Sequence, residues 1–251
     1  MTEESELAVD DRSWGRARLT RQALVRAAAD QFYSGGYQGA SLDGIVTGAG
    51  VTKGALYFHF AHKRALANAV IAEMNALRAV MVDEITERGL DPLRTLLAES
   101  DQVVQDLINH PIVRGGNRLL RDPMLRSAGG TQLAAQRYRR SEGAVATQLD
   151  AASAAGLLRP EVGSGQRAAL ARSIIATIIG HQMICDLTGA DTELWGRITE
   201  MWQHLLPRIA TDGWLSRWHA GDWAHRPRPG VSSPWAGEPL RSGAGSRAIP
   251  A

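Results

Sequence analysis

The stretch from Ser41 to Phe60 concentrates side chains that can hold a phosphate group, and it reads SLDGIVTGAGVTKGALYFHF. Lys53 supplies an ammonium group, Tyr57 an aromatic hydroxyl, and Ser41 and Thr52 short hydroxyls. Such groups, above all at helix N-termini, make the backbone contacts of proteins that bind nucleic acids. These residue types therefore indicate the binding of a polyanion.

Two short helices joined by a tight turn are expected to position these side chains. Ser41 is a good N-cap for the first helix, Thr52 can cap the second, and Gly48 to Gly50 supply the turn. Gly44 and Gly48 count against a stable first helix, because each costs up to about 1 kcal/mol relative to alanine. Two interpretations stay open, two ordinary helices around a glycine turn or a helix-turn-helix motif.

The second of these helices has the face that a recognition helix needs. Lys53 and Tyr57 are four residues apart and therefore share the outward side, with Gly54 between them. A glycine lets the helix backbone approach DNA closely, and the N-terminal residues of a recognition helix touch base edges in the major groove. Phe58 and Phe60 are expected to belong to the core instead.

The distribution of charge favours the DNA-binding interpretation. The chain has 251 residues and a formal net charge of +2, but residues 12–64 hold eight Lys or Arg against Asp30 and Asp43, a local charge of +6. Residues 1–11 hold five acidic residues and no basic ones. A positive segment on an otherwise nearly neutral chain is the electrostatic footprint of a phosphate-binding module.

The sequence gives little support for disulfide, metal or enzyme chemistry. The single cysteine, Cys185, excludes an intramolecular disulfide and a multi-cysteine zinc site, and its apolar neighbours indicate a buried, inert thiol. His59 and His62 are too few, and lack supporting carboxylates, to indicate a metal site. The sequence contains no glycine-rich phosphate loop, paired-carboxylate helix or nucleophile with a base. We therefore expect a protein that is not an enzyme and needs no cofactor.

Apolar residues recur at spacings of three and four from Leu19 to about Ile209, which predicts an all-α fold. The longest apolar run, Ile174–Ile179, is far shorter than the roughly 20 residues of a membrane span, and residues 1–11 do not resemble a signal peptide. A cytoplasmic protein is expected. No β-hairpin pattern follows Phe60, which disfavours a winged helix. We expect about nine helices, near 18–34, 41–47, 52–58, 62–88, 92–109, 112–121, 131–155, 165–188 and 192–211.

These motifs carry a family resemblance. The segment from Leu19 to Ile71, above all GVTKGALYFHF followed by HKRALANAVI, resembles the N-terminal domain of TetR-family repressors. Within that family it is most similar to the γ-butyrolactone autoregulator receptors, and HPIVRGGNRL, AAGLLRPEV and MWQHLLPRIA are similar to later segments of that subfamily. The resemblance implies a homodimeric repressor that binds a pseudo-palindromic operator in double-stranded DNA and leaves it when a small-molecule effector binds.

The implied organisation has four parts. Residues 1–17 are expected to form a flexible tail, residues 18–64 the helix-turn-helix domain, and residues 65–212 a domain that binds the effector and dimerises. Residues 213–251 shift to Pro, Gly, Ser, Arg and Trp, a composition that cannot build a core, so this tail is expected to be disordered.

The resemblance also implies roles for individual residues. The recognition helix would meet DNA through Thr52, Lys53, Gly54 and Tyr57, and phosphates would be contacted by Ser41, His59 and Lys63. The last two long helices would form the dimer interface, which suits a helix that is apolar around most of its girth. The alternative is burial of these residues within the monomer. The interface positions are Ile174, Leu194, Ile198, Met201 and Leu205.

An effector cavity would lie among the fourth to eighth expected helices. The γ-butyrolactone receptors carry a tryptophan in the seventh helix that closes over the ligand, whereas this chain has none between Trp14 and Trp195. The effector would be a γ-butyrolactone-type signal or an antibiotic-related metabolite, and the missing tryptophan favours the second. The alternative is a TetR-type repressor of an efflux or catabolic operon that answers to an unrelated apolar compound. The candidate lining residues are Val103, Leu107, Val113, Leu120, Tyr138, Ile178 and Gln182.

Overall fold

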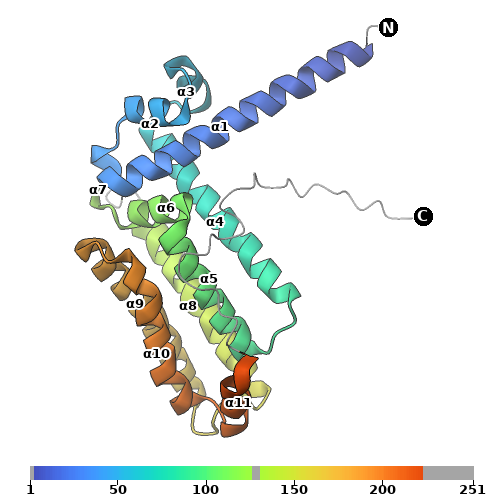
Figure 1. Cartoon of the computed structure of the whole chain (residues 1–251), viewed down its shortest axis with the longest axis vertical. Coiled ribbons are helices and arrows are strands. Elements are labelled where there is room, and N and C mark those ends of the chain that lie inside the picture. Colours follow the sequence, from blue (N-terminus) through green and yellow to red (C-terminus); the bar gives the residue numbers. More distant parts are fainter. Residues whose placement is uncertain (1–2, 126–130, 223–251) are drawn as a thin grey trace.

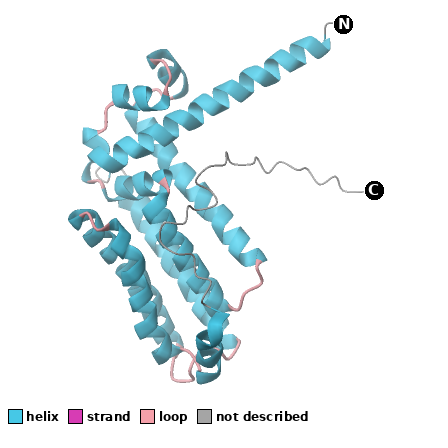
Figure 2. Cartoon of the chain, viewed as in Figure 1, coloured by secondary structure: helices cyan, strands magenta, loops and turns pink. Residues whose placement is uncertain are grey.

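The computed structural model describes residues 3–125 and 131–222, and the regular elements in these ranges are helices (Figures 1 and 2). The all-α prediction is confirmed, with eleven α-helices in the described residues rather than about nine. A 3₁₀ turn precedes α10 at Asp191–Glu193, and a π turn follows α11 at Trp218–Asp222. The helices are α1 (Glu3–Gly39), α2 (Leu42–Ala49), α3 (Lys53–His59), α4 (Lys63–Glu87), α5 (Pro92–Asn109), α6 (Pro111–Arg121), α7 (Pro123–Leu125), α8 (Thr131–Ala154), α9 (Ser164–Thr188), α10 (Leu194–Ile209) and α11 (Asp212–Arg217).

The differences from the expected helices lie at the two ends of the chain and at the short α7. Helix α1 begins at Glu3, so residues 3–17, expected as a flexible tail, are helical. Helix α11 and the π turn extend the described chain to Asp222. The remainder of the expected disordered tail, residues 223–251, lies outside the described residues.

Helices α1, α2 and α3 form a three-helix unit, called here the N-terminal unit. Phe32 of α1, Ile45 of α2 and Leu56 of α3 are completely buried at its centre. Of the two glycines that would weaken α2, Gly44 is the more crowded, since a Cβ there would lie 2.9 Å from Oγ of Ser41 and 3.0 Å from Oε1 of Gln31, whereas one at Gly48 would be in ordinary contact, 3.4 Å from Cβ of Ala27. Gly50 ends α2 with a φ of 64°, a left-handed conformation that glycine adopts without strain.

The remaining helices form a bundle on one side of the N-terminal unit (Figure 1). Helix α4 runs from the unit into the bundle, where α8 packs on α5 and α9, and α10 packs on α5 and α9. Two buried tryptophans hold this bundle together. Nε1 of Trp202 donates to Oγ of Ser100 at 3.0 Å, and Nε1 of Trp214 donates to Oδ1 of Asp91 at 3.1 Å.

Helix α6 is packed between the N-terminal unit and α4, and two adjacent glycines make this possible. A Cβ at Gly115 would lie 2.4 Å from the backbone oxygen of Ala29 in α1, and one at Gly116 would lie 2.7 Å from Sδ of Met74 in α4. No side chain therefore fits between the backbones of α6 and α1 at Gly115.

Helices α4 and α9 are long and apolar enough, by length and composition alone, to span a membrane. Each contains an 18-residue window with a mean hydropathy of 1.4, which the short uninterrupted apolar runs of the sequence do not reveal. The core helix of a soluble protein passes the same test. Here α4 packs on α5 and α6, and α9 packs on α8 and α10, and 33% and 22% of the two windows are buried in the structure.

Replacing Gly115 by alanine should destabilise the protein, because the added methyl group would force the backbones of α6 and α1 apart. We expect the free energy of unfolding to fall by about 2 kcal/mol, measured by urea denaturation followed by circular dichroism. Gly143→Ala in α8 is the matched control, since a Cβ there would meet nothing within 4 Å. That variant should gain about 0.5–1 kcal/mol. Wild-type stability of the Gly115 variant would contradict the close approach.

Candidate nucleic-acid interface and buried cavity

Two hydroxyl side chains cap the N-termini of α2 and α3, as the sequence predicts. Oγ of Ser41 accepts a hydrogen bond from the backbone N–H of Gly44 at 2.9 Å, and Oγ1 of Thr52 accepts one from Ala55 at 3.2 Å. Both residues are exposed, so each hydroxyl keeps its own hydrogen for a second partner. The caps fix the two helices and leave two donors on the surface, where a phosphate could bind.

Lys53 lies on the outward face of α3. Its Nζ is 2.9 Å from Oδ1 of Asp43, and the two side chains are 58% and 78% exposed. The hydrogen bond to Asp43 raises the pKa of Lys53, which keeps the ammonium charged at neutral pH. Because solvent screens an exposed pair of this kind, a phosphate group can take the place of the carboxylate.

Gly54 and Tyr57 complete this outward face. Tyr57 is half exposed. A Cβ at Gly54 would point into open space, with Oγ1 of Thr52, 3.9 Å away, as the nearest atom. A glycine inside a helix costs up to about 1 kcal/mol relative to alanine. At Gly54 no neighbouring atom of the chain would prevent an alanine. Its position fits close approach by a second molecule.

Lys63 differs from the expected phosphate contact, because its ammonium group is turned into the protein. Nζ donates to the backbone oxygens of Gln38 at 3.1 Å and Ala40 at 2.5 Å, and it lies 5.0 Å from the ring centroid of Tyr37. Burial lowers the pKa of Lys63. The side chain thus ties the start of α4 to the end of α1 and acts as a structural link.

The aromatic residues at the end of α3 lie on opposite faces. Phe60 is buried as predicted, but Phe58 is 80% exposed, so the expectation that it belongs to the core is wrong. Leu56 and Phe60 are four residues apart and share the inner face, whereas Phe58 is two residues from each and points away. His59 lies beside both rings, with centroid distances of 5.0 Å to Phe58 and 6.4 Å to Phe60.

A cavity of about 90 Å³ lies inside the bundle, with walls from α4, α5, α6, α8, α9 and α10. Leu120, one of the seven candidate effector contacts, lies instead in an adjoining groove of about 380 Å³ formed mainly by α4 and α8. The structure thus gathers most of the candidates around one internal space. Those that line the cavity are Val103, Leu107, Val113, Tyr138, Ile178 and Gln182.

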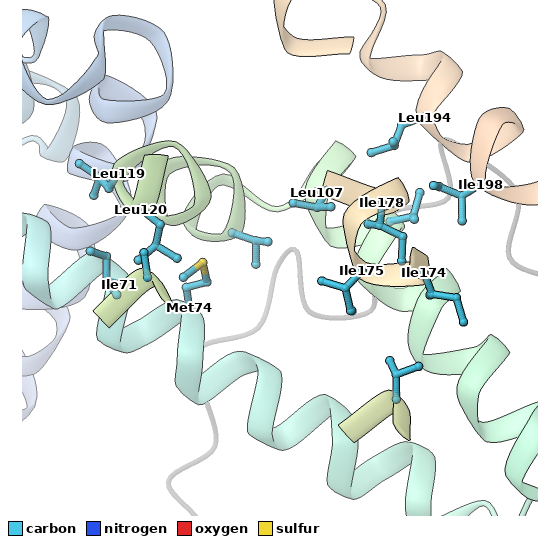
Figure 3. Packing of buried hydrophobic residues seen from close by; sticks show 14 of the residues in the cluster. Ile71, Met74, Leu107, Leu119, Leu120, Ile174, Ile175, Ile178, Leu194 and Ile198 are labelled. Carbon is cyan, nitrogen blue, oxygen red and sulfur yellow. The ribbon is translucent and has the colours of Figure 1, made fainter. Parts of the chain in front are cut away.

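Much of the cavity wall is apolar. Ile174, Ile175 and Ile178 of α9 lie together with Leu107 of α5 (Figure 3). Trp202 of α10 also lines the cavity, with its indole N–H held by Ser100. The sequence signal for Trp202 is its position four residues from both Ile198 and Leu206, on the buried stripe of α10. A tryptophan thus lines this cavity from α10, although α8 has none.

Charged side chains lie where the cavity meets the groove. Arg78 of α4, Glu99 of α5, and Arg137 and Ser141 of α8 line both spaces. Burial and the nearby charge of Arg78 lower the pKa of Arg137 to about 10, so it stays protonated at neutral pH. Burial also lowers the pKa of Arg78 and raises that of Glu99. Single-sequence patterns do not reveal this cluster, because its members come together only in the tertiary structure.

The residues expected at a dimer interface fall into two groups. Ile174, Leu194 and Ile198 are only 1–2% exposed, because they pack within the bundle (Figure 3), and a partner chain could not reach them. This corrects the expectation for these three positions. Their apolar spacing marks the face that α9 and α10 turn toward their own chain. Met201 and Leu205 are partly exposed.

A different face of α9 carries exposed apolar side chains. Met183, Ile184 and Leu187 are 50%, 42% and 80% exposed, respectively. Ala176 and Gly180 continue the same stripe toward the N-terminus of the helix, at spacings of three and four. The stripe is long enough, and its residues small enough at one end, for a second helix to pack against it.

Comparison with known proteins points to one family. Residues 24–70 match the family described as bacterial regulatory proteins, tetR family. The chain is also 32% identical, over 198 residues, to the A-factor receptor protein of Streptomyces griseus. This alignment covers 79% of the chain and 66% of the relative, so the chain spans slightly less than two thirds of that protein's length.

Solved structures extend the similarity to the bundle. One is TylP, a TetR regulator from Streptomyces fradiae, with 30% identity and a TM-score of 0.59 over 80% of this chain and 92% of that one. Another is an ArpA-like γ-butyrolactone receptor, with 25% identity and a TM-score of 0.66 over 82% of this chain and 95% of that one.

Replacing Lys63 by methionine should destabilise the N-terminal unit, because the backbone oxygens of Gln38 and Ala40 lose their donor. We expect the free energy of unfolding to fall by about 1–3 kcal/mol, measured by chemical denaturation. Lys53→Met is the control, and its melting temperature should stay close to the wild-type value because that ammonium group is exposed. A Lys63 variant as stable as the control would show that the link to α1 contributes nothing.

Proposed function

We infer that this chain, which belongs to the TetR family of bacterial regulatory proteins, is a cytoplasmic transcriptional repressor. In this proposal it binds a pseudo-palindromic operator as a homodimer, and a small molecule in the cavity of the bundle releases it. The observation that carries the proposal is the outward face of α3. Lys53 and Tyr57 are exposed there, and Gly54 has open space beside it.

The proposed DNA contacts follow from the chemistry of that surface. Lys53 and Tyr57 would reach the groove and its phosphates, and Gly54 would let the backbone of α3 approach them. The hydroxyls of Ser41 and Thr52, which keep a free hydrogen, and the ring of His59 would donate to phosphate oxygens. Lys63 is left out of this set because its ammonium group donates to the backbone oxygens of Gln38 and Ala40.

Selection of bound sequences from random double-stranded DNA, followed by affinity measurements on the selected site, tests this interface. Gly54→Ala should weaken binding at least about tenfold, since the loss of one good contact is worth about 1–3 kcal/mol. The same variant should melt at the wild-type temperature or above it, because alanine favours the helix. Lys53→Ala should weaken binding and reduce its dependence on salt.

Gly143→Ala, a glycine-to-alanine change in α8, is the matched control and should bind the selected DNA as the wild type does. Wild-type affinity and salt dependence in both α3 variants would contradict the assignment of α3 as the recognition helix. A protein that enriches no sequence in the selection would contradict the repressor proposal as a whole.

The exposed apolar stripe of α9 supports the proposed dimer. A contiguous apolar surface on a helix marks a place where another protein packs, and a C2 dimer would set the same stripe of each copy against the other. Met201 and Leu205 of α10, which are partly exposed, would border this contact. Two copies would present two α3 helices to the two half-sites of a pseudo-palindrome.

Leu187→Glu and Met183→Glu should each produce monomers, because a carboxylate without a partner is costly to bury in an apolar interface. Sedimentation velocity measures the change, and affinity for a full operator should fall with it. Ala151→Glu, on an exposed position of α8, is the control and should remain dimeric. Intact dimers in both α9 variants would place the interface elsewhere.

Release by an effector is supported by a helix that reaches both sites. Helix α4 starts at the N-terminal unit with Lys63 and lines the cavity with Met74, Arg78 and Met81. A ligand that binds the non-DNA geometry more tightly would shift the population away from DNA, with a typical coupling of about 1–3 kcal/mol. The relatives named as an A-factor receptor and a γ-butyrolactone receptor support an effector of that kind or an antibiotic-related metabolite.

A further inference from the structure

Two guanidinium groups at the junction of the cavity and the groove form no hydrogen bond or ion pair with a carboxylate of the described residues. Within residues 3–125 and 131–222, Arg78 forms no hydrogen bond or ion pair, although it lines both spaces. Arg137 is held by neutral atoms, since its Nη1 donates to Oδ1 of Asn75 at 2.9 Å and to Sδ of Met74 at 3.4 Å. Both side chains are partly buried, and a charge shielded from bulk water is unfavourable unless something pairs with it.

Arginines elsewhere in the bundle do have partners. Arg114 pairs with Asp191 at 3.0 Å, and Arg121 pairs with Asp186. These pairs tie helices together, which is a structural role. Arg78 has no comparable role within the described chain, so its charge is available to a ligand.

Burial lowers the pKa of Arg78, and the charges of Glu99 and Asp106 nearby oppose that shift. Glu99 is only 8% exposed, and burial raises its pKa, which favours its protonated form. Asp106 accepts a hydrogen bond from Nε2 of Gln102 at 3.0 Å. The other polar groups that line the cavity from α6, α8 and α9 are neutral, namely Asn117, Tyr138, Ser141 and Gln182. Arg78 and Arg137 thus line the cavity, and neither guanidinium group is hydrogen-bonded to a carboxylate in the described residues.

On the basis of the proposed function, we propose that the effector is an amphiphilic carboxylate. Its carboxylate group binds Arg78 and Arg137, and its apolar body occupies the cavity beside Trp202. Guanidinium groups recognise carboxylates through paired, charge-assisted hydrogen bonds, which gain strength away from water. A neutral molecule of the same shape would leave Arg78 without a partner, and a cation would be repelled.

The experiment compares straight-chain carboxylates of six, eight and ten carbons with their primary amides, by calorimetry on the full chain. At least one carboxylate should bind about tenfold more tightly than its amide. Arg78→Met keeps the apolar stem and should abolish this preference, and Arg137→Met should reduce it. Arg140→Met removes an exposed arginine that lines only the groove and should leave the preference intact. Glu99→Gln should tighten carboxylate binding several-fold.

Equal binding of acids and amides, no binding of any of the six probes at millimolar concentration, or an undiminished preference in Arg78→Met would overturn the proposal. Arg78→Met also gives a readout without ligand. Its melting temperature should equal the wild-type value or exceed it by a few degrees, because an unpaired charge is removed. A lower melting temperature would show that Arg78 serves the fold.

Affinity for the selected DNA distinguishes a failure of the repressor proposal from a failure of the effector proposal. A wild-type protein that binds no DNA contradicts the repressor proposal. A protein with normal DNA affinity but no preference for carboxylates contradicts only the proposal about the effector.

Discussion

The packing of α6 on α1 is the contact on which the rest of the arrangement depends. At Gly115 the two helices touch through their backbones, so no flexible side chain can absorb a movement of one relative to the other. Val113 and Asn117 of the same short helix line the cavity. Asp191, just before α10, accepts hydrogen bonds from Tyr33 of α1 at 2.7 Å and Arg114 of α6 at 3.0 Å. A ligand that displaces α6 must therefore displace α1 or break these contacts, which is how a change inside the bundle can reach the N-terminal unit.

Features that depend on neighbours in the sequence could be predicted from the sequence. The caps at Ser41 and Thr52 are examples, because a hydroxyl accepts from an N–H three residues ahead in the same chain. The recurrence of apolar residues at spacings of three and four predicted the all-α fold for the same reason. Lys63 could not be predicted in this way. Its donors are used by the carbonyls of Gln38 and Ala40, more than twenty residues away, and nothing in the local pattern indicates that contact.

The spacing of apolar residues also does not show whether an apolar face of a helix is covered by its own chain or by another molecule. Helix α9 is apolar around much of its girth, and its pattern does not distinguish Ile174, which faces its own chain, from Leu187, which faces outward. The charged cluster at the cavity is a harder case. Arg78, Glu99 and Arg137 belong to three different helices, so only the tertiary structure brings them together.

The residues that most strongly indicate a binding function are those whose type is not required by packing or pairing within the chain. Gly115 has no room for a side chain because the backbone of Ala29 lies against it, whereas Gly54 has open space beside it. Arg114 and Arg121 form ion pairs, whereas Arg78 forms none with the part of the chain that the structure describes. Features that cost stability without a compensating contact tend to occur at sites that bind something else. Arg78 lies on α4, about 22 Å along the helix from Lys63 at 1.5 Å per residue. Because α4 is one continuous helix whose first residue is bonded to the end of α1, a shift at Arg78 must be accommodated at the N-terminal unit.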